Sequence, residues 1–397
     1  MNPTLGIYLS VPFCRTKCSF CNFASDVFSR AVFDRYIDRV SQDIANAPRL
    51  ARDMNARLPQ QADSIYLGGG TPTVLEPAQL ARLFAAVRRQ FELLPGAEIT
   101  VECAPGTLTP VMLETLQACG VNRISLGVQS FIDAEAAAVG RLHKRSTTLD
   151  DIARLRAAGI ANLSVDLIAG LPHQTAESWQ KSLDEVVAAG VPHVSVYMLE
   201  VDEDSRLGRE LIAGGTRYHA HFVPDEDATA DFYLAACETL NAAGIQQYEI
   251  SNFARPGSES QHNLKYWTRQ PYLGFGVDAH SMLLASPPDS NLTAPRAVRF
   301  ATPDTLDQFV AGTPPNHTPI HSPEALEEAF FLGLRLNQGV NLDLLAAEFE
   351  KESVDKAQPA IAQLTAEGLL QQRDRQISLT TRGRLLSNEA FQRFLGS

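Results

Sequence analysis

The chain has 397 residues, a length that suggests one large domain and one smaller domain, and its 45% hydrophobic and 20% charged residues are typical of a globular protein. Its formal net charge of −12 at pH 7 argues against a nucleic-acid-binding surface, because such a surface needs a basic stripe. No apolar run reaches the roughly 18 residues of a membrane-spanning helix, and the first residues do not resemble a signal peptide, so we expect a cytoplasmic protein.

Six short runs rich in β-branched residues alternate with amphipathic stretches in the first half of the chain. The runs are residues 6–11, 64–69, 98–103, 123–128, 162–168 and 193–199. Near-continuous apolar strands with helices between them are typical of a parallel sheet that is covered on both faces. The pattern predicts an α/β fold, either an open barrel or a doubly wound sheet, with functional residues at the carboxyl ends of the strands.

The character of the sequence changes after residue 283. Residues 284–320 contain seven prolines and are expected to form an extended connection. A helix is predicted over 322–336, with Ser322 as its N-cap and Pro323 as its first residue. Further helices and a strand pair follow, which predicts a small helical, winged-helix-like packing module. The predicted division is therefore 1–283, 284–320 and 321–397.

Three cysteines gather directly after the first predicted strand. Cys14, Cys18 and Cys21 have the spacing C-x3-C-x2-C. A structural zinc site needs four ligands and no histidine lies nearby, whereas three cysteines on a four-iron cube leave one iron open to an outside ligand. On spacing alone, a zinc or redox site remains an alternative. The other cysteines stand singly in apolar contexts and are expected to be buried: Cys103, Cys119 and Cys237.

Glycines and polar residues follow the next predicted strands. Residues 68–70 are all glycine, which lets the backbone approach a ligand closely. Glu102 ends the third strand, where a carboxylate can accept two hydrogen bonds from a ribose diol. Gln129, Arg141 and Asp166 lie at or near the later strand ends. Each alone could belong to a turn or a surface ion pair, but their joint placement favours a ligand site.

The cysteine motif closely resembles the signature of the radical S-adenosylmethionine superfamily. Together with "GGGTPT", "RISLGVQSF", "GRLH", "DLIAGLP" and "GFGVDAHS", it resembles the oxygen-independent coproporphyrinogen III oxidase family over residues 1 to about 390. The resemblance implies a partial (β/α)6 TIM-like barrel and a [4Fe–4S] cluster on the three cysteines, shielded by Phe20. It implies that S-adenosylmethionine is bound by Tyr8, Gly69, Gly70, Thr71, Glu102, Gln129, Arg141 and Asp166.

Two departures separate the sequence from the oxidases. Phe23 stands where they carry a fourth cysteine, and the cysteines already begin at position 14, whereas the oxidases have a long segment ahead of them. Both features resemble the sister group of HemW-type heme chaperones, as does the H-N-x-x-Y-W motif at 262–267. The resemblance implies that His262 binds heme iron, with Tyr266 and Trp267 stacking on the porphyrin.

The leading hypothesis is a heme chaperone that delivers heme to acceptor hemoproteins. A membrane-bound respiratory enzyme is a possible acceptor, and a homodimer is a possible state of the chaperone. The alternatives are the oxidase, which decarboxylates two propionates, and a radical methyltransferase that opens heme. Whether the protein is an enzyme stays open, and no catalytic residue is assigned. Second-choice heme ligands are His173 and His280, and an H-x-H pair, His219 and His221, could bind a metal or lie in a solvated loop.

Overall fold

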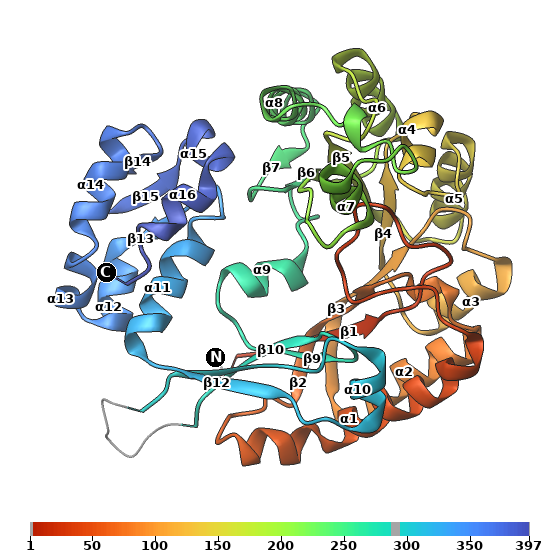
Figure 1. Ribbon diagram of the computed structural model, residues 1–397. Coiled ribbons are helices and arrows are strands. Elements are labelled where there is room, and N and C mark those ends of the chain that lie inside the picture. Colours follow the sequence, from red (N-terminus) through yellow and green to blue (C-terminus); the bar gives the residue numbers. More distant parts are fainter. Residues whose placement is uncertain (1–2, 287–293, 397) are drawn as a thin grey trace.

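The computed structural model describes residues 3–286 and 294–396 and contains two layered parts (Figure 1). The larger part is built on a twelve-stranded sheet, and the smaller, C-terminal part on a three-stranded sheet with helices around it. Within the described residues, none of the helices combines the length and the apolar character that crossing a membrane requires.

The six predicted strands are confirmed and lie side by side in parallel. They are β1 Leu5–Val11, β2 Gln61–Gly69, β3 Glu92–Cys103, β4 Arg123–Gln129, β5 Asn162–Ala169 and β6 His193–Met198. The strand order of the whole sheet is β12-β11-β10-β9-β1-β2-β3-β4-β5-β6-β8-β7, so the sheet has two free edges and does not close on itself. The architecture is therefore the predicted partial barrel.

The remaining strands extend the sheet on both sides. On the β6 side these are β8 Asn252–Ala254 and β7 Gln246–Gln247; on the β1 side they are β9 Tyr272–Phe275, β10 His280–Leu284, β11 Ala297–Ala301 and β12 Asn316–Ile320. Within the described part of the proline-rich segment, β11 and β12 are extended, but they pair within the main sheet and have the helix α10 Leu306–Ala311 between them. Part of this segment, 287–293, lies outside the described residues.

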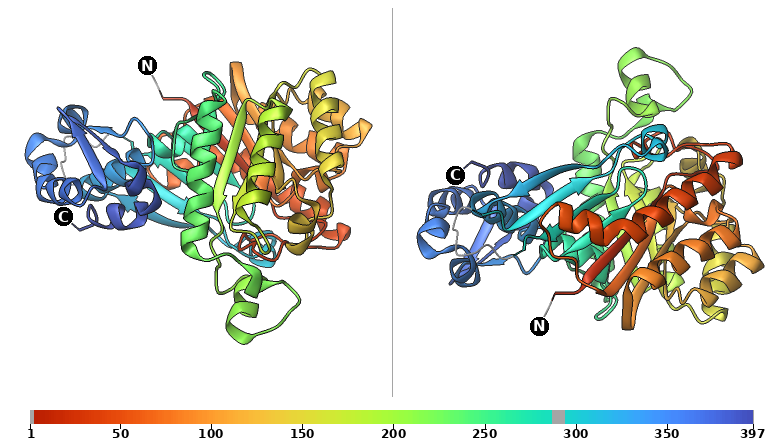
Figure 2. Two further views of the ribbon diagram at one scale, coloured as in Figure 1. Left: turned by 90° about the horizontal axis from the view of Figure 1, so that it is seen from above. Right: turned by 90° about the horizontal axis from the view of Figure 1, so that it is seen from below.

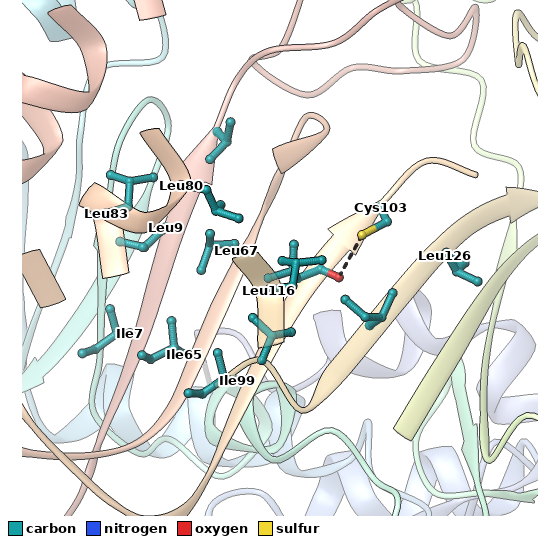
Figure 3. Close-up of a cluster of buried hydrophobic side chains, with 14 of the residues drawn as sticks. Ile7, Leu9, Ile65, Leu67, Leu80, Leu83, Ile99, Cys103, Leu116 and Leu126 are labelled. Atoms are coloured by element: carbon teal, nitrogen blue, oxygen red, sulfur yellow. Dashed lines mark hydrogen bonds between the residues drawn. The ribbon is translucent and has the colours of Figure 1, made fainter. Parts of the chain in front are cut away.

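Helices cover the outer face of the sheet. They are α1 Phe33–Asp53, α2 Pro77–Gln90, α3 Pro110–Ala118, α4 Asp133–Ala138, α5 Arg145–Ala157, α6 Ala176–Ala189 and α8 Glu226–Ala242. Figure 3 shows part of this core, with Ile7, Leu9, Ile65 and Leu67 of the strands beside Leu80 and Leu83 of α2. Each buried aliphatic side chain of this kind contributes roughly 1.5–3 kcal/mol.

Side chains of alternate strand positions point to the other face, the interior of the barrel, which we call the lumen. Tyr8, Tyr66, Glu102 and Asp166 are only partly buried there, and Tyr197 is 43% exposed. By contrast, the core between the outer face of the sheet and the helices is closed to solvent, with Ile7 and Leu9 at 0% exposure. The lumen is therefore open to solvent, as a ligand site requires.

A short helix, α9 Gln261–Trp267, closes the lumen at the amino ends of the strands. The carboxylate of Glu98 on β3 accepts hydrogen bonds from the backbone amides of Gln261 at 3.2 Å and His262 at 3.1 Å. Glu98 is itself 3.9 Å from the guanidinium of Arg123 on β4, and both side chains are almost fully buried. An acidic group at a helix amino terminus is stabilising, so this ion pair fixes α9 to the barrel.

The C-terminal module has the predicted helices and strand pair, and its core continues onto Tyr272 and Met282 of the main sheet. Its elements are α11 Ser322–Gly333, β13 Val340–Asn341, α12 Leu342–Phe349, α13 Lys351–Asp355, α14 Gln358–Ala366, β14 Leu370–Arg373, β15 Gln376–Leu379, α15 Thr381–Leu385 and α16 Ser387–Gln392. The predicted N-cap was wrong by one position. His321 is the N-cap and Ser322 is already helical, because its hydroxyl accepts a hydrogen bond from Arg296 at 3.0 Å instead of capping the helix.

Candidate functional site

The cysteine loop follows β1 and packs against the glycine-rich end of β2. The backbone amide of Gly70 donates to the carbonyl of Val11, and that of Thr71 donates to the carbonyl of Phe13, both at 2.8 Å. A Cβ atom at Gly70 would lie 2.7 Å from the Val11 carbonyl oxygen, so no side chain fits there. The glycine run therefore sets the position of the loop that carries the cysteines.

Each of the three cysteine sulfurs has one polar side chain beside it. Thr71 Oγ1 donates to Cys14 Sγ at 3.9 Å and Arg141 Nη1 to Cys18 Sγ at 3.4 Å, while the Cys21 and Ser25 side chains are 3.8 Å apart. Hydrogen bonds to cysteine sulfurs are among the features that set the potential of an iron–sulfur cluster. The sulfurs lie on one loop with partners from three parts of the chain.

The loop supplies three thiol ligands, which is one short of a closed structural zinc site and matches a four-iron cube with one open iron. Burial, with smaller contributions from Cys21 and Cys18, raises the pKa of the Cys14 thiol. Over residues 3–286 and 294–396, no three His, Cys, Asp or Glu side chains converge around one point where they could hold a metal ion. Phe20 packs beside a small apolar cluster of Val139, Ile168 and Leu171, whereas Phe23 is 63% exposed.

Glu102 and Tyr66 lie in the lumen next to the glycine run. Tyr66 donates a hydrogen bond to Glu102 Oε1 at 2.8 Å. Burial, opposed by that hydrogen bond and reinforced by Asp166, raises the pKa of Glu102 to about 7. The neighbouring Gly69 has a φ of +97°, a conformation that favours glycine, and a Cβ atom there would lie 3.3 Å from the Tyr8 hydroxyl.

The later candidates gather at the same end of the lumen. Ser125 Oγ donates to Asp166 at 3.1 Å, and burial raises the pKa of that carboxyl. The side chains of Gln129 and Arg141 both approach Gly127, whose carbonyl accepts a hydrogen bond from Arg141. The Arg141 Nε atom is buried and, within the described residues, makes no hydrogen bond. The predicted S-adenosylmethionine residues are thus brought together beside the cysteines.

His262 lies at the opposite end of the lumen from the cysteines. It is fully buried, with Nδ1 2.9 Å from Ser64 Oγ and Nε2 2.9 Å from the Tyr266 hydroxyl. Burial, with a smaller effect of Lys265, lowers the pKa of His262 to about 3. His262 and Tyr266 lie one turn apart on α9, and both ring nitrogens of His262 already have partners.

The aromatic residues of the same motif are also packed. The Tyr266 ring meets the Tyr272 ring edge-on with centroids 4.6 Å apart, and the Arg335 guanidinium lies 4.3 Å from the centre of the Trp267 ring. A porphyrin that stacked on these faces would have to displace their present neighbours. The site residues predicted from the sequence therefore form two groups, one at each end of the lumen.

Sequence reasoning missed the polar residues that hold each group in place. Ser64 and Tyr66 alternate along β2 and point into the lumen, and Glu98 and Arg123 anchor α9. The period-two spacing of Ser64 and Tyr66 was a usable signal, since alternate strand residues share one face. The link between Glu98 and α9 spans 164 positions and leaves no local signal.

Replacing Glu102 by glutamine is expected to flatten the dependence of stability on pH. The native carboxyl has a pKa of about 7, above the ~4.3 of an unfolded chain, so its contribution to the free energy of unfolding is full below about pH 4 and lost as the pH rises through 7. Partial exposure to the lumen limits the difference to about 1–3 kcal/mol. Urea unfolding of both proteins at pH 5 and pH 8 measures this difference in the free energy of unfolding. An equal pH dependence in E102Q and the parent chain would contradict the raised pKa of Glu102.

Comparison with known proteins adds information about the family. The model of the Radical SAM superfamily matches residues 8–186, and that of the HemN C-terminal domain matches residues 320–386. The heme chaperone HemW of Bacillus subtilis is 34% identical over 396 residues, covering 98% of both chains. The heme chaperone HemW of Lactococcus lactis is 31% identical over 392 residues, covering 98% of this chain and 96% of its own.

Among solved structures, the coproporphyrinogen III oxidase HemN of Escherichia coli, a radical SAM enzyme, superposes with a TM-score of 0.82. The alignment covers 99% of this chain and 90% of the other at 23% sequence identity. The likeness therefore concerns the fold, including the C-terminal module.

Proposed function

The chain belongs to the HemW heme-chaperone family of radical S-adenosylmethionine proteins, and from this premise we propose that it binds heme and delivers it to acceptor hemoproteins. The observation that carries the proposal is the full-length similarity to proteins named heme chaperone HemW. Phe23 in place of a fourth cysteine also supports the heme chaperones over the oxidases. We further propose a cytoplasmic protein that can act as a homodimer and whose acceptors include membrane-bound respiratory enzymes.

In this proposal Cys14, Cys18 and Cys21 hold a [4Fe–4S] cluster, and Phe20 shields it. Such a cluster can transfer an electron to S-adenosylmethionine bound at its open iron. The donor set of the loop and the polar partner beside each sulfur support the assignment.

S-adenosylmethionine would bind across the carboxyl ends of β1 to β5. The residues proposed to contact it are Tyr8, Gly69, Gly70, Thr71, Glu102, Gln129, Arg141 and Asp166. A pocket lined in part by Thr71 and Arg141 lies beside the cysteine loop, and the buried Arg141 Nε has no hydrogen-bond partner among the described residues. A free guanidinium donor of this kind suits a carboxylate.

His262 remains the iron ligand predicted from the sequence. For His262 to bind iron, its Nε2 atom must give up the hydrogen bond to the Tyr266 hydroxyl. The porphyrin must also reach the closed end of the lumen. A neutral imidazole is the ligating form, and the low pKa of His262 favours that form.

An anaerobic heme titration of the cluster-reconstituted protein, followed by the Soret band, tests the proposal. We expect saturable, stoichiometric binding, followed by transfer of intact heme to an added apo-hemoprotein. Absence of binding would contradict the chaperone. The second candidate, favoured by the shared fold with HemN, is the oxidase, which predicts 5′-deoxyadenosine and protoporphyrinogen from coproporphyrinogen III under reducing conditions. A heme-opening methyltransferase would consume the bound heme instead of releasing it.

A further inference from the structure

A pair of imidazoles, one exposed and one half-buried, lies outside both groups of predicted site residues. After β6 the chain leaves the barrel as a protruding segment with α7 Arg206–Ala213 and η3 Ala220–Phe222 (Figure 2). His219 immediately precedes η3, and its Nδ1 lies 3.0 Å from Nε2 of His173, in the loop between β5 and α6. The partner of His219 is therefore His173, and not its sequence neighbour His221.

The surrounding backbone holds this pair in a defined geometry. His173 and His219 both have left-handed conformations, with φ of 67° and 61°, which disfavour non-glycine residues by about 1–2 kcal/mol. The Glu210 carboxylate accepts hydrogen bonds from the backbone amides on either side of His219, those of Tyr218 at 2.7 Å and Ala220 at 3.1 Å. Strained residues that neighbouring groups hold in place are a common feature of ligand sites.

The two loops are also joined to each other and to the cysteine loop. The His173 amide donates to the carbonyl of Phe222 at 2.9 Å. The Leu207 amide of α7 donates to the carbonyl of Ser19 at 2.8 Å, between Cys18 and Cys21. The imidazole pair is thus attached to the end of the barrel that carries the cysteines.

The hydrogen bond between the rings prepares one nitrogen to bind a metal. A metal-ligating histidine usually donates its second ring N–H to an acceptor, which fixes its tautomer and raises its basicity. When His219 Nδ1–H donates to His173 Nε2, His219 Nε2 carries the lone pair. His262 and His193 differ, because both are buried and hydrogen-bonded through both ring nitrogens.

An aromatic ring packed on the pair and exposed apolar side chains on the attached α7 offer a surface for a flat ligand. The Phe222 ring stacks on His173 with centroids 4.2 Å apart and is 53% exposed. Leu211 and Ile212 on the attached α7 are 53% and 68% exposed. Arg217, exposed two residues before His219, supplies a cation for a propionate group. An imidazole, an aromatic ring, aliphatic side chains and a cation together match the chemistry of heme.

Building on the proposed heme-binding function, we propose that heme binds at this protruding surface with Nε2 of His219 as an iron ligand and His173 as the acceptor that orients it. This site requires no opening of the buried network around His262. It also leaves heme at the surface, where an acceptor can reach it.

The test is an anaerobic hemin titration of the full-length, cluster-reconstituted protein and its variants. We expect H219A to weaken hemin binding by about tenfold or more and to lose the histidine-ligated Soret position, and H173A to weaken binding by about tenfold through loss of the orienting partner. H221A is the matched control, since this exposed histidine lies on the same loop outside the proposed pair, and it should bind like the parent chain. Circular dichroism and thermal unfolding check that the variants are folded.

The outcomes separate this proposal from the proposed function. If the parent chain binds hemin and both H173A and H219A bind it equally well, the site proposed here is overturned and the chaperone function stands. If H262A alone abolishes binding, the iron belongs to His262. If the parent chain binds no hemin, the heme-binding function itself is overturned.

Discussion

Replacing Cys18 by alanine is expected to abolish assembly of the iron–sulfur cluster. Only three cysteines are available in the loop, so losing one leaves two thiolates for four irons. Cys18 is the most buried of the three and the one that accepts a hydrogen bond from Arg141. After anaerobic reconstitution, iron content is expected to fall from about four per chain to below about one, with loss of the broad visible absorption of the cluster.

Cys119 provides the matched control for this experiment. It is also a buried free cysteine, but it lies at the end of α3 among core residues, away from the cysteine loop. C119A is expected to keep the full cluster. A C18A variant that assembles as much cluster as C119A would mean that the three-cysteine loop is not the cluster site.

Replacing Arg123 by alanine is expected to lower the free energy of unfolding by about 3–5 kcal/mol. Its side chain is 2% exposed and donates hydrogen bonds to Asn162 Oδ1 and to the Ser258 carbonyl, both at 2.9 Å, besides pairing with Glu98. Removing it leaves the buried Glu98 carboxylate without its cation. Urea unfolding measures the change in the free energy of unfolding, provided that its slope with urea concentration is the same in the variant and the parent chain.

The surface pair of Arg30 and Glu76 is the control for the buried pair. Their side chains are 71% and 56% exposed, so R30A is expected to cost less than about 1 kcal/mol. Hydrogen exchange of the amides of α9 should quicken in R123A and stay unchanged in R30A, because Glu98 holds the first turn of α9. Equal losses of stability in the two variants would contradict the anchoring role of Arg123.

The sequence was sufficient to predict the strands and the end of the barrel that carries the chemistry. Apolar β-branched runs and the cysteine spacing are local features, and the carboxyl-end rule for parallel strands placed Glu102 and Arg141 near the cysteines. The error at the N-cap of α11 has a tertiary cause. His321 is the N-cap instead of Ser322, because the Ser322 hydroxyl accepts a hydrogen bond from Arg296, 26 positions earlier in the chain.

The positions of the histidines could not be predicted from the sequence. The bond between Ser64 and His262 joins residues 198 positions apart, and that between His173 and His219 joins residues 46 positions apart. An H-x-H spacing suggested that His219 would pair with His221, but the His219 ring lies 3.0 Å from the ring of His173 in another loop. Such contacts depend on tertiary packing, for which periodicity and motif spacing give no signal.

The incomplete barrel has a consequence for solubility. A sheet with two free edges exposes unpaired backbone groups to which a strand of another chain could add. One edge strand, β7, is only two residues long, and the other, β12, contains Pro319, which lacks an N–H group to donate. Both edges are therefore poor templates for strand addition, which lets the protein keep an open barrel without promoting edge-to-edge aggregation.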